Sequence, residues 1–417
     1  MKNKIANLIK HPLFSGSALM ILGSNLANFI AYLYHLIIGR MLGPVAYGEL
    51  SSVISALALI FISLNFLSLI IVKFVSSAQK NELNSIYTFF TRQAFRVGVV
   101  LALIVLVLSP FFSNFLHISL ATFLLIVPIL TFAVPTFVYR SFLQGLLRFK
   151  EVVVSTNIDI VGRLVLGVIF VIFGFSSFGA VMGICLSSIL TFFFLRFLLK
   201  DYRLSRSKSP FSKIGNLISY AKPLFFATLA TNSMFSTDVI LVKHYFNAHE
   251  AGIYASISTL GRIIFYGAGP VGAVMFPMIA QKYSRGENYK KIFSLSALFT
   301  GGIILAVLFV YLFFPALSIR ILFGEKFLEG SSLLFPFGIF MALFTFASLL
   351  VSYFLAKDKT KVTFITVLSA ILQVAGITFF HTSLQSVIKV SIFASAFLLV
   401  LLVLYLIYEV KKDREHK

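Results

Sequence analysis

The sequence of 417 residues contains a single cysteine, no tryptophan and only 14 acidic residues. Because a disulfide needs two thiols, Cys185 alone excludes a disulfide bond within the chain. Without tryptophan, the aromatic residues that anchor helix ends at a membrane surface have to be tyrosines. Charged residues make up 12% of the chain, and no stretch between the hydrophobic segments is long enough for a soluble domain.

The sequence also lacks the short motifs of common enzymes. It contains no H-E-x-x-H zinc motif, no G-x-S-x-G nucleophile elbow and no phosphate-binding Walker loop. We therefore expect a protein that is not an enzyme, with no catalytic residues, no cofactor and no metal site.

Long hydrophobic segments make up most of the chain. Hydrophobic residues account for 59% of it, and the mean hydropathy is +0.99. A helix needs about 20 apolar residues to cross a bilayer, and backbone polar groups facing lipid must be paired within the segment. The sequence therefore predicts an all-α polytopic membrane protein. Its twelve expected transmembrane helices are 14–39, 48–75, 87–112, 119–146, 152–173, 178–199, 216–243, 251–280, 289–315, 331–355, 361–380 and 384–409.

Lysines and arginines are distributed asymmetrically around these segments. Both termini and every second loop hold 28 of them, with Arg140 counted there, and the other loops hold 5. Basic loops stay on the cytoplasmic side of a membrane. We therefore predict a protein of the plasma (inner) membrane with both termini in the cytoplasm. The net charge of +21 follows from this topology, so we expect no nucleic-acid partner.

The two halves of the chain resemble each other at an offset near 204 residues. Gly48 corresponds to Gly252, and Ser52 corresponds to Ser256. With six spans in each half, both halves enter the membrane from the same side, so the repeats are parallel. We predict two six-helix lobes, 1–204 and 205–417, around a central cleft.

Two motifs resemble a known family. Gly39-Arg40-Met41-Leu42-Gly43-Pro44, followed by Tyr47-Gly48, resembles the turn after the first helix of polysaccharide-biosynthesis flippases, the Wzx-like O-antigen and capsule exporters. Ile321-Leu322-Phe323-Gly324-Glu325-Lys326-Phe327 is similar to the external loop before the tenth helix of that family. The resemblance extends over the whole chain. It implies a transporter that moves a polyprenyl-diphosphate-linked oligosaccharide from the inner to the outer leaflet.

Of the 35 lysines and arginines, only Arg163 and Arg262 are not assigned to a terminus or loop, and Asp159 and Asp238 are similarly placed within spans, so these four residues are candidates for a binding site. Charges within a bilayer are costly and usually face the interior of a bundle or an aqueous cavity. The arginine guanidinium can hold the oxygens of a diphosphate with a fork of donors. We therefore predict that Arg163 and Arg262 bind an anionic head group or an acidic sugar.

Each candidate also has a structural interpretation. Asp159 and Arg163 are four residues apart and can pair on one helix face, and for them both interpretations stay open. Arg262 has no acid within four positions, so its partner is a ligand, water or a residue of another helix. Asp238 lies toward the external end of its span. It either couples transport to H⁺ or Na⁺, or caps a helix end that faces solvent.

Uncharged polar residues form stripes at helical spacing on the first and seventh spans. Ser24 and Asn28 correspond to Thr228 and Asn232 in the repeat. The resemblance implies that both helices border the cleft, so we predict that these four residues contact the hydroxyl groups of the sugar. Hydrogen bonds between helices are the structural alternative.

Two other functions are considered as alternatives. A multidrug or organic-cation exporter of the same superfamily is expected to have a carboxylate on the first span, and 14–39 contains none. A membrane-embedded glycosyltransferase or polymerase needs a long external loop with a catalytic base, and the predicted external loops are short.

Overall fold

A computed structural model of the protein describes residues 12–79, 82–202 and 214–415. The described residues are helical, as predicted, with short connections. The chain forms two compact units. Unit 1 comprises Met1–Leu42 and Ile60–Ile218, and unit 2 comprises Gly43–Leu59 and Ser219–Lys417. The segment 43–59 thus belongs to the unit built mainly from the C-terminal half, and the predicted lobes 1–204 and 205–417 stay a prediction.

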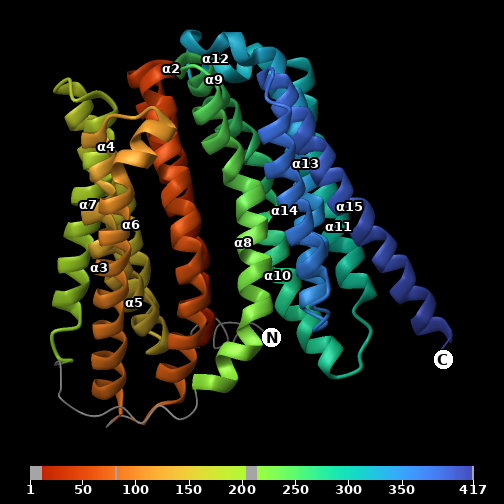
Figure 1. Cartoon of the computed structure of the whole chain (residues 1–417). Helices are drawn as coiled ribbons and strands as arrows, with labels where there is room; N and C mark the ends of the chain where they lie inside the picture. Colours follow the sequence, from red (N-terminus) through yellow and green to blue (C-terminus); the bar gives the residue numbers. More distant parts are fainter. Residues whose placement is uncertain (1–11, 80–81, 203–213, 416–417) are drawn as a thin grey trace, which may run out of the picture. The chain divides into compact units, whose positions relative to one another are not determined.

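Unit 1 is built from helices, most of them long (Figure 1). They are the two outer parts of α2 (Pro12–Ser77), α3 (Leu83–Leu116), the short α4 (Leu120–Leu124), α5 (Ile126–Gly145), α6 (Phe149–Ile172) and α7 (Ser176–Leu198). Helix α6 packs along α7, and α3 packs along α5. Glycine permits the close approach of α6 and α7, because a Cβ on Gly183 would lie 2.5 Å from the backbone nitrogen of Gly167.

Unit 2 contains the middle part of α2 and the helices of the C-terminal half. These are α8 (Ile214–Tyr245) from Ser219 onward, α9 (Ala248–Gly261), α10 (Ile263–Ser284), α11 (Lys290–Phe313), α12 (Pro315–Leu322), the 3₁₀ turn η1 (Glu325–Gly330), α13 (Ser331–Leu355), α14 (Val362–Phe379) and α15 (Leu384–Glu415). Helix α13 packs against α10, α11 and α15. Its residues Phe337, Phe340 and Phe344 are fully buried, so α13 lies at the core of this unit.

The long helix α2 contains the first two predicted spans, 14–39 and 48–75, and is kinked between them. Gly43 has φ 70° and ψ 178°, a conformation that glycine adopts without a steric clash. Pro44 follows directly, at the start of the next helical segment, where its missing N–H costs nothing.

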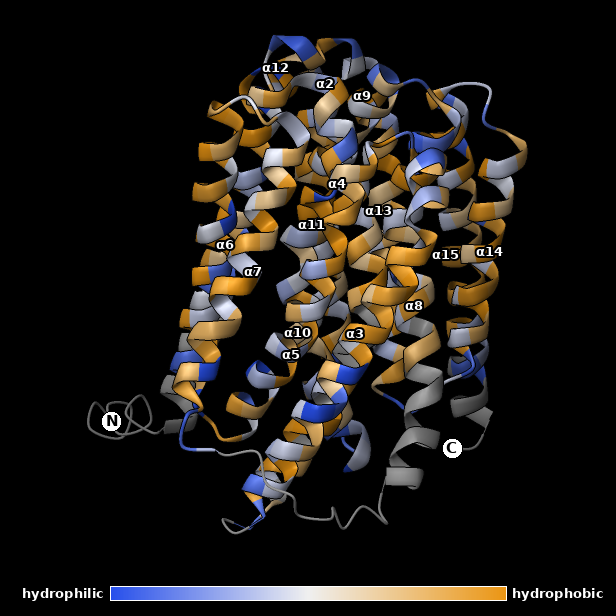
Figure 2. Cartoon of the chain, turned by 60° about the vertical axis from the view of Figure 1, so that its left-hand side comes forward, coloured by the Kyte–Doolittle hydropathy of each residue, from blue (hydrophilic) through white to orange (hydrophobic). Residues whose placement is uncertain are grey.

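Ten segments among the described residues are long and apolar enough to cross a membrane. One of them, 23–61, continues across the kink at Gly43. Helix α8 is not among the ten, although it contains the predicted span 216–243. Figure 2 shows hydrophobic residues along the length of the helices. The protein is therefore a multi-pass membrane protein, and the number of twelve helices stays a prediction.

The two motifs that carry the family resemblance pack against each other in unit 2. Tyr47 is fully buried and contacts the rings of Phe323 and Phe327 edge-on, with centroid distances of 5.3 and 6.1 Å. Its hydroxyl oxygen lies 2.8 Å from Oγ1 of Thr259. These contacts give the aromatic residues of both motifs a role in packing.

Gly48 and Gly252, which correspond in the predicted repeat, are direct neighbours in unit 2. A Cβ on Gly48 would lie 2.9 Å from the backbone nitrogen of Gly252, and a Cβ on Gly252 would lie 1.8 Å from the carbonyl oxygen of Pro44. Residues without a Cβ let the two helix backbones approach this closely.

Replacing Gly252 with alanine is expected to lower the melting temperature of the protein in detergent. The added methyl group overlaps a backbone carbonyl, and overpacking typically costs about 1–3 kcal/mol of folding free energy, or more where the backbone must move. Gly301→Ala on α11 is the matched control, since a Cβ there meets no atom within 4 Å. Equal melting temperatures for Gly252→Ala and the wild type would contradict the close helix contact.

Candidate functional site

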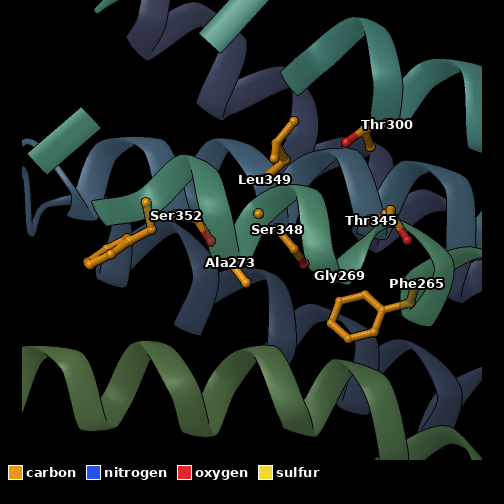
Figure 3. Close-up of a pocket in the computed structure, with 11 residues that line it drawn as sticks. Phe265, Gly269, Ala273, Thr300, Thr345, Ser348, Leu349 and Ser352 are labelled. Atoms are coloured by element: carbon orange, nitrogen blue, oxygen red, sulfur yellow. The ribbon is translucent and has the colours of Figure 1, made fainter. Parts of the chain in front are cut away.

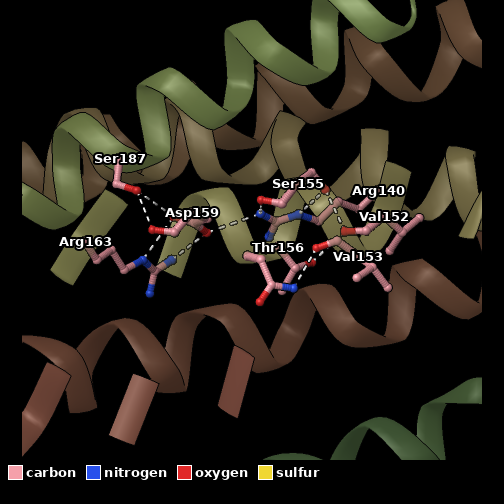
Figure 4. Close-up of polar contacts among 9 residues, drawn as sticks. Arg140, Val152, Val153, Ser155, Thr156, Asp159, Arg163 and Ser187 are labelled. Atoms are coloured by element: carbon pink, nitrogen blue, oxygen red, sulfur yellow. Dashed lines mark hydrogen bonds and ion pairs between the residues drawn. The ribbon is translucent and has the colours of Figure 1, made fainter. Parts of the chain in front are cut away.

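Asp159 of α6 is the centre of an ionic cluster in unit 1 (Figure 4). Its carboxylate accepts hydrogen bonds from Arg163, one turn later on the same helix, from Nε at 3.0 Å and Nη2 at 2.8 Å. The hydroxyl of Ser187 on α7 also lies within 3.3 Å of the carboxylate. The side-chain pair at helical spacing that the sequence suggested is therefore present.

Arg140 of α5 supplies a second guanidinium group to this cluster. Its Nη2 lies 3.3 Å from Oδ2 of Asp159 and donates to the carbonyl oxygen of Ser155 at 3.0 Å. Arg140, which we counted with the cytoplasmic loops, lies within α5, and its place on the cytoplasmic side stays a prediction. Its position inside the predicted span 119–146 was the signal that could have identified it.

Two arginines against one aspartate give the cluster a net charge of +1. The side chain of Asp159 is 7% exposed, that of Arg140 is 22% exposed and that of Arg163 is 36% exposed. The ion pair does not remove the positive charge, since a single carboxylate serves both guanidinium groups. Arg163 is the most accessible of the three and can offer the surplus charge to an anion.

A second ionic group lies in unit 2. Asp238 of α8 is fully buried and accepts a hydrogen bond of 2.8 Å from the hydroxyl of Tyr254 on α9. Arg262 lies at the junction of α9 and α10, with Nη2 3.9 Å from Oδ1 of Asp238. The same Nη2 donates to the carbonyl oxygen of Phe235 at 2.6 Å, and the guanidinium lies 4.4 Å from the centre of the Phe235 ring.

The surroundings of Arg262 differ from those of Arg163. The side chain of Arg262 is only 13% exposed, and its acidic partner comes from another helix, one of the options expected from the sequence. Asp238 is 0% exposed, so the interpretation of a cap at a solvent-facing helix end is wrong. Arg262 thus holds Asp238 in place, and its predicted contact with an anionic head group stays a prediction.

The four polar residues that we predict to contact the sugar are distributed over both units. Ser24 and Asn28 occupy exposed positions of α2 in unit 1. In unit 2, Asn232 of α8 donates from Nδ2 to the carbonyl oxygen of Thr228 at 2.8 Å, and both residues are partly buried. Within the described ranges, no group of three or more His, Cys, Asp or Glu residues is arranged to hold a metal ion.

Comparison with known proteins identifies the family. The family model described as polysaccharide biosynthesis protein matches residues 13–283, which is well over half of the chain. The chain belongs to this family. The resemblance based on the two short motifs is thereby confirmed. With this family assignment, the expectation that the protein is not an enzyme is also confirmed.

Solved structures of transporters share the fold of this chain. The lipid II flippase MurJ, in an inward closed conformation, has a TM-score of 0.74 at 14% identity over 94% of this chain and 87% of that one. An inward-facing multidrug resistance MATE family transporter of the MOP superfamily has a TM-score of 0.70 at 14% identity, over 94% and 98%. A MOP superfamily transporter from Pyrococcus furiosus has a TM-score of 0.61 at 16% identity, over 93% of both chains. None of the curated proteins matches the sequence.

Proposed function

We propose that the protein flips a polyprenyl-diphosphate-linked oligosaccharide from the inner to the outer leaflet of the plasma (inner) membrane, for the synthesis of a surface polysaccharide such as an O-antigen. The observation that carries the proposal is the cluster of Arg140, Asp159 and Arg163, with its surplus positive charge on an accessible guanidinium. A diphosphate presents several anionic oxygens that suit an arginine fork. The family assignment and the likeness to a lipid II flippase support a lipid-linked substrate.

The proposed mechanism is alternating access. Two six-helix lobes, 1–204 and 205–417, open a central cleft first to one side of the membrane and then to the other. The saccharide crosses in the cleft while the polyprenyl tail stays in lipid. Ser24, Asn28, Thr228 and Asn232 contact hydroxyl groups of the saccharide.

Asp238 is the proposed site of ion coupling. Its Oδ1 is buried and has no hydrogen-bond partner among the described residues, while Oδ2 is held by Tyr254. A carboxylate that exchanges its ion pair with Arg262, 3.9 Å from Oδ1, can take up H⁺ or bind Na⁺. Because the sequence contains no nucleotide-binding motif, transport against a gradient would use such an ion or the consumption of the product.

The proposal is tested in a bacterial strain that lacks its own flippase and therefore accumulates lipid-linked saccharide. Expression of the protein should restore surface polysaccharide, and purified protein in vesicles should expose a labelled lipid-linked saccharide to an external enzyme. The rival is a multidrug or organic-cation exporter, which the likeness to MATE transporters favours. Resistance to cationic drugs without restored polysaccharide would support the rival and overturn the proposal.

The proposed orientation leads to a topology prediction. In a Cys185→Ala background, a cysteine at His249 should react with an impermeant thiol reagent from outside the cell. A cysteine at Arg285 should react only after the membrane is opened. The side chains of His249 and Arg285 are 45% and 63% exposed, so the fold itself does not shield either position from the reagent. The reverse labelling pattern would contradict cytoplasmic termini.

A further inference from the structure

Lys357 is surrounded by three tyrosine rings at one end of unit 2. Its Nζ lies 5.5 Å from the centre of the Tyr283 ring, 5.3 Å from that of Tyr289 and 5.4 Å from that of Tyr353. An ammonium group within about 6 Å of an aromatic ring centre is attracted by the negative face of the ring. Lys357 is only 4% exposed. The three rings, which we call the tyrosine box, therefore stabilise a buried positive charge.

The tyrosine box joins the ends of three helices. Tyr283 lies in the last turn of α10, Tyr289 directly precedes α11, and Tyr353 lies in the last turn of α13. Lys357 follows α13 in the turn that leads to α14. The rings of Tyr283 and Tyr289 also contact each other edge-on, with a centroid distance of 5.8 Å. One lysine thus holds the end of α10 against α11 and α13, on the side of the membrane that we predict to be cytoplasmic.

The second half of α10 has few other buried residues. The structure describes every residue of this half, and between Val271 and Ser284 only Met275 and Ile279 are buried. Helix α13, by contrast, buries 14 of its 25 residues. A segment with few buried apolar contacts opens more easily than a core helix. The tyrosine box therefore attaches a weakly packed helix end to the core of the unit.

The middle of α10 has the residues of a bend. Three glycines, Gly267, Gly269 and Gly272, surround Pro270. The proline has no N–H to donate to the carbonyl oxygen of Tyr266, and its ring clashes with that carbonyl in a straight helix. Glycine adds backbone freedom on both sides. Prolines and glycines are the usual positions at which helices kink, so the second half of α10 can change its direction here.

The structure also leaves space beside this stretch. A cavity of about 370 Å³ lies between α10, α11 and α13, and Phe265, Gly269 and Ala273 line it along α10 (Figure 3). A Cβ on Gly269 would meet no atom within 4 Å, and a Cβ on Gly272 would meet only Leu349, at 4.0 Å. These two glycines therefore do not serve close packing of helices. A bend of α10 meets little steric resistance at this point.

We propose that the tyrosine box is a clasp that sets the position of the second half of α10. With Lys357 in the box, the end of α10 is held against α11 and α13. When Lys357 leaves the box, α10 bends at the stretch around Pro270, and its end moves away from the turn between α13 and α14. Unit 2 thereby has a closed and an open arrangement at this end. The inference goes beyond the proposed function, because it holds for any substrate that the protein carries.

Two nitroxide labels measure this movement in the purified full-length protein. In a Cys185→Ala background, the labels are attached to cysteines at Arg285, at the end of α10, and at Lys361, at the start of α14, since both positions are exposed. Pulsed electron paramagnetic resonance should give one main distance. Lys357→Met should raise the population of a longer distance roughly fivefold or more, because it removes the charge that the rings attract. Lys357→Arg should not, since a guanidinium also binds aromatic faces.

A second substitution tests the bend in α10. In the Lys357→Met protein, Pro270→Ala should remove the longer distance, because alanine restores the N–H donor and stiffens the helix. Pro336→Ala is the matched control, since Pro336 also lies inside a helix, but in α13. It should leave the longer distance in place. Lys291→Met removes an exposed lysine at the start of α11 and should not create the longer distance.

The outcomes distinguish a clasp from a contact that serves packing alone. A Lys357→Met protein with an unchanged distance would overturn the clasp, whether or not its melting temperature falls. A longer distance that persists after Pro270→Ala would overturn the bend at this proline. The distances do not depend on the substrate, so failure of the clasp and failure of the proposed flipping, which is scored as surface polysaccharide, are detected separately.

Discussion

Arg163→Gln is expected to reduce the flipping of a diphosphate-linked saccharide roughly ten- to hundredfold while the protein stays folded. The substitution lowers the charge of the cluster from +1 to zero and removes its most accessible guanidinium, but Asp159 keeps Arg140 as its partner. Hydrogen bonds to charged groups contribute about 1.5–3 kcal/mol, which corresponds to this loss. Initial flipping rates in vesicles, with equal amounts of reconstituted protein, measure the effect.

Arg148→Gln is the matched control for this prediction. Arg148 precedes the same helix and pairs with Glu151 at 3.0 Å, but both side chains are about one-third exposed, so the pair contributes at most about 1 kcal/mol to stability. This variant should flip saccharide at the wild-type rate. Arg163→Lys should keep part of the activity, since it retains the charge but not the fork of donors. Unchanged flipping by a folded Arg163→Gln protein would exclude the cluster as the diphosphate site.

Local chemistry explains which parts of the fold could be predicted from the sequence. Helices in lipid must be long and apolar, and these constraints can be read directly from composition and spacing. The kink at Gly43 also follows from local sequence, since glycine and proline occur together there. The placement of 43–59 in unit 2 depends on contacts between distant segments, such as Tyr47 with Phe323, which no local pattern specifies.

The candidate site shows the same division. The pairing of Asp159 with Arg163 could be predicted because helical periodicity places them on one face. The position of Arg140 inside a predicted span marked it as a candidate, but its pairing with Asp159 could not be predicted, since it requires α5 to bring a residue 19 positions earlier in the chain against α6. Likewise, no spacing rule connects Asp238 with Arg262 across two helices.

Arg262→Gln is expected to destabilise the protein by about 3–5 kcal/mol, the usual cost of leaving one partner of a buried ion pair without its counter-charge. Asp238 is 0% exposed and would keep only the hydrogen bond from Tyr254. The loss should appear as a lower melting temperature in detergent and as reduced amounts of folded protein. Arg320→Gln is the control, because Arg320 is 60% exposed and pairs with the exposed Glu325.

A second substitution should reverse this loss. Asp238→Asn in the Arg262→Gln background removes the uncompensated charge, and the asparagine oxygen can still accept the Tyr254 hydroxyl, so most of the stability should return. Recovery of stability without recovery of ion-driven transport would assign the pair to coupling as well as to packing. Wild-type stability of the single Arg262→Gln variant would show that Asp238 does not depend on this arginine. Wild-type transport by that stable variant would exclude Arg262 from the transport mechanism too.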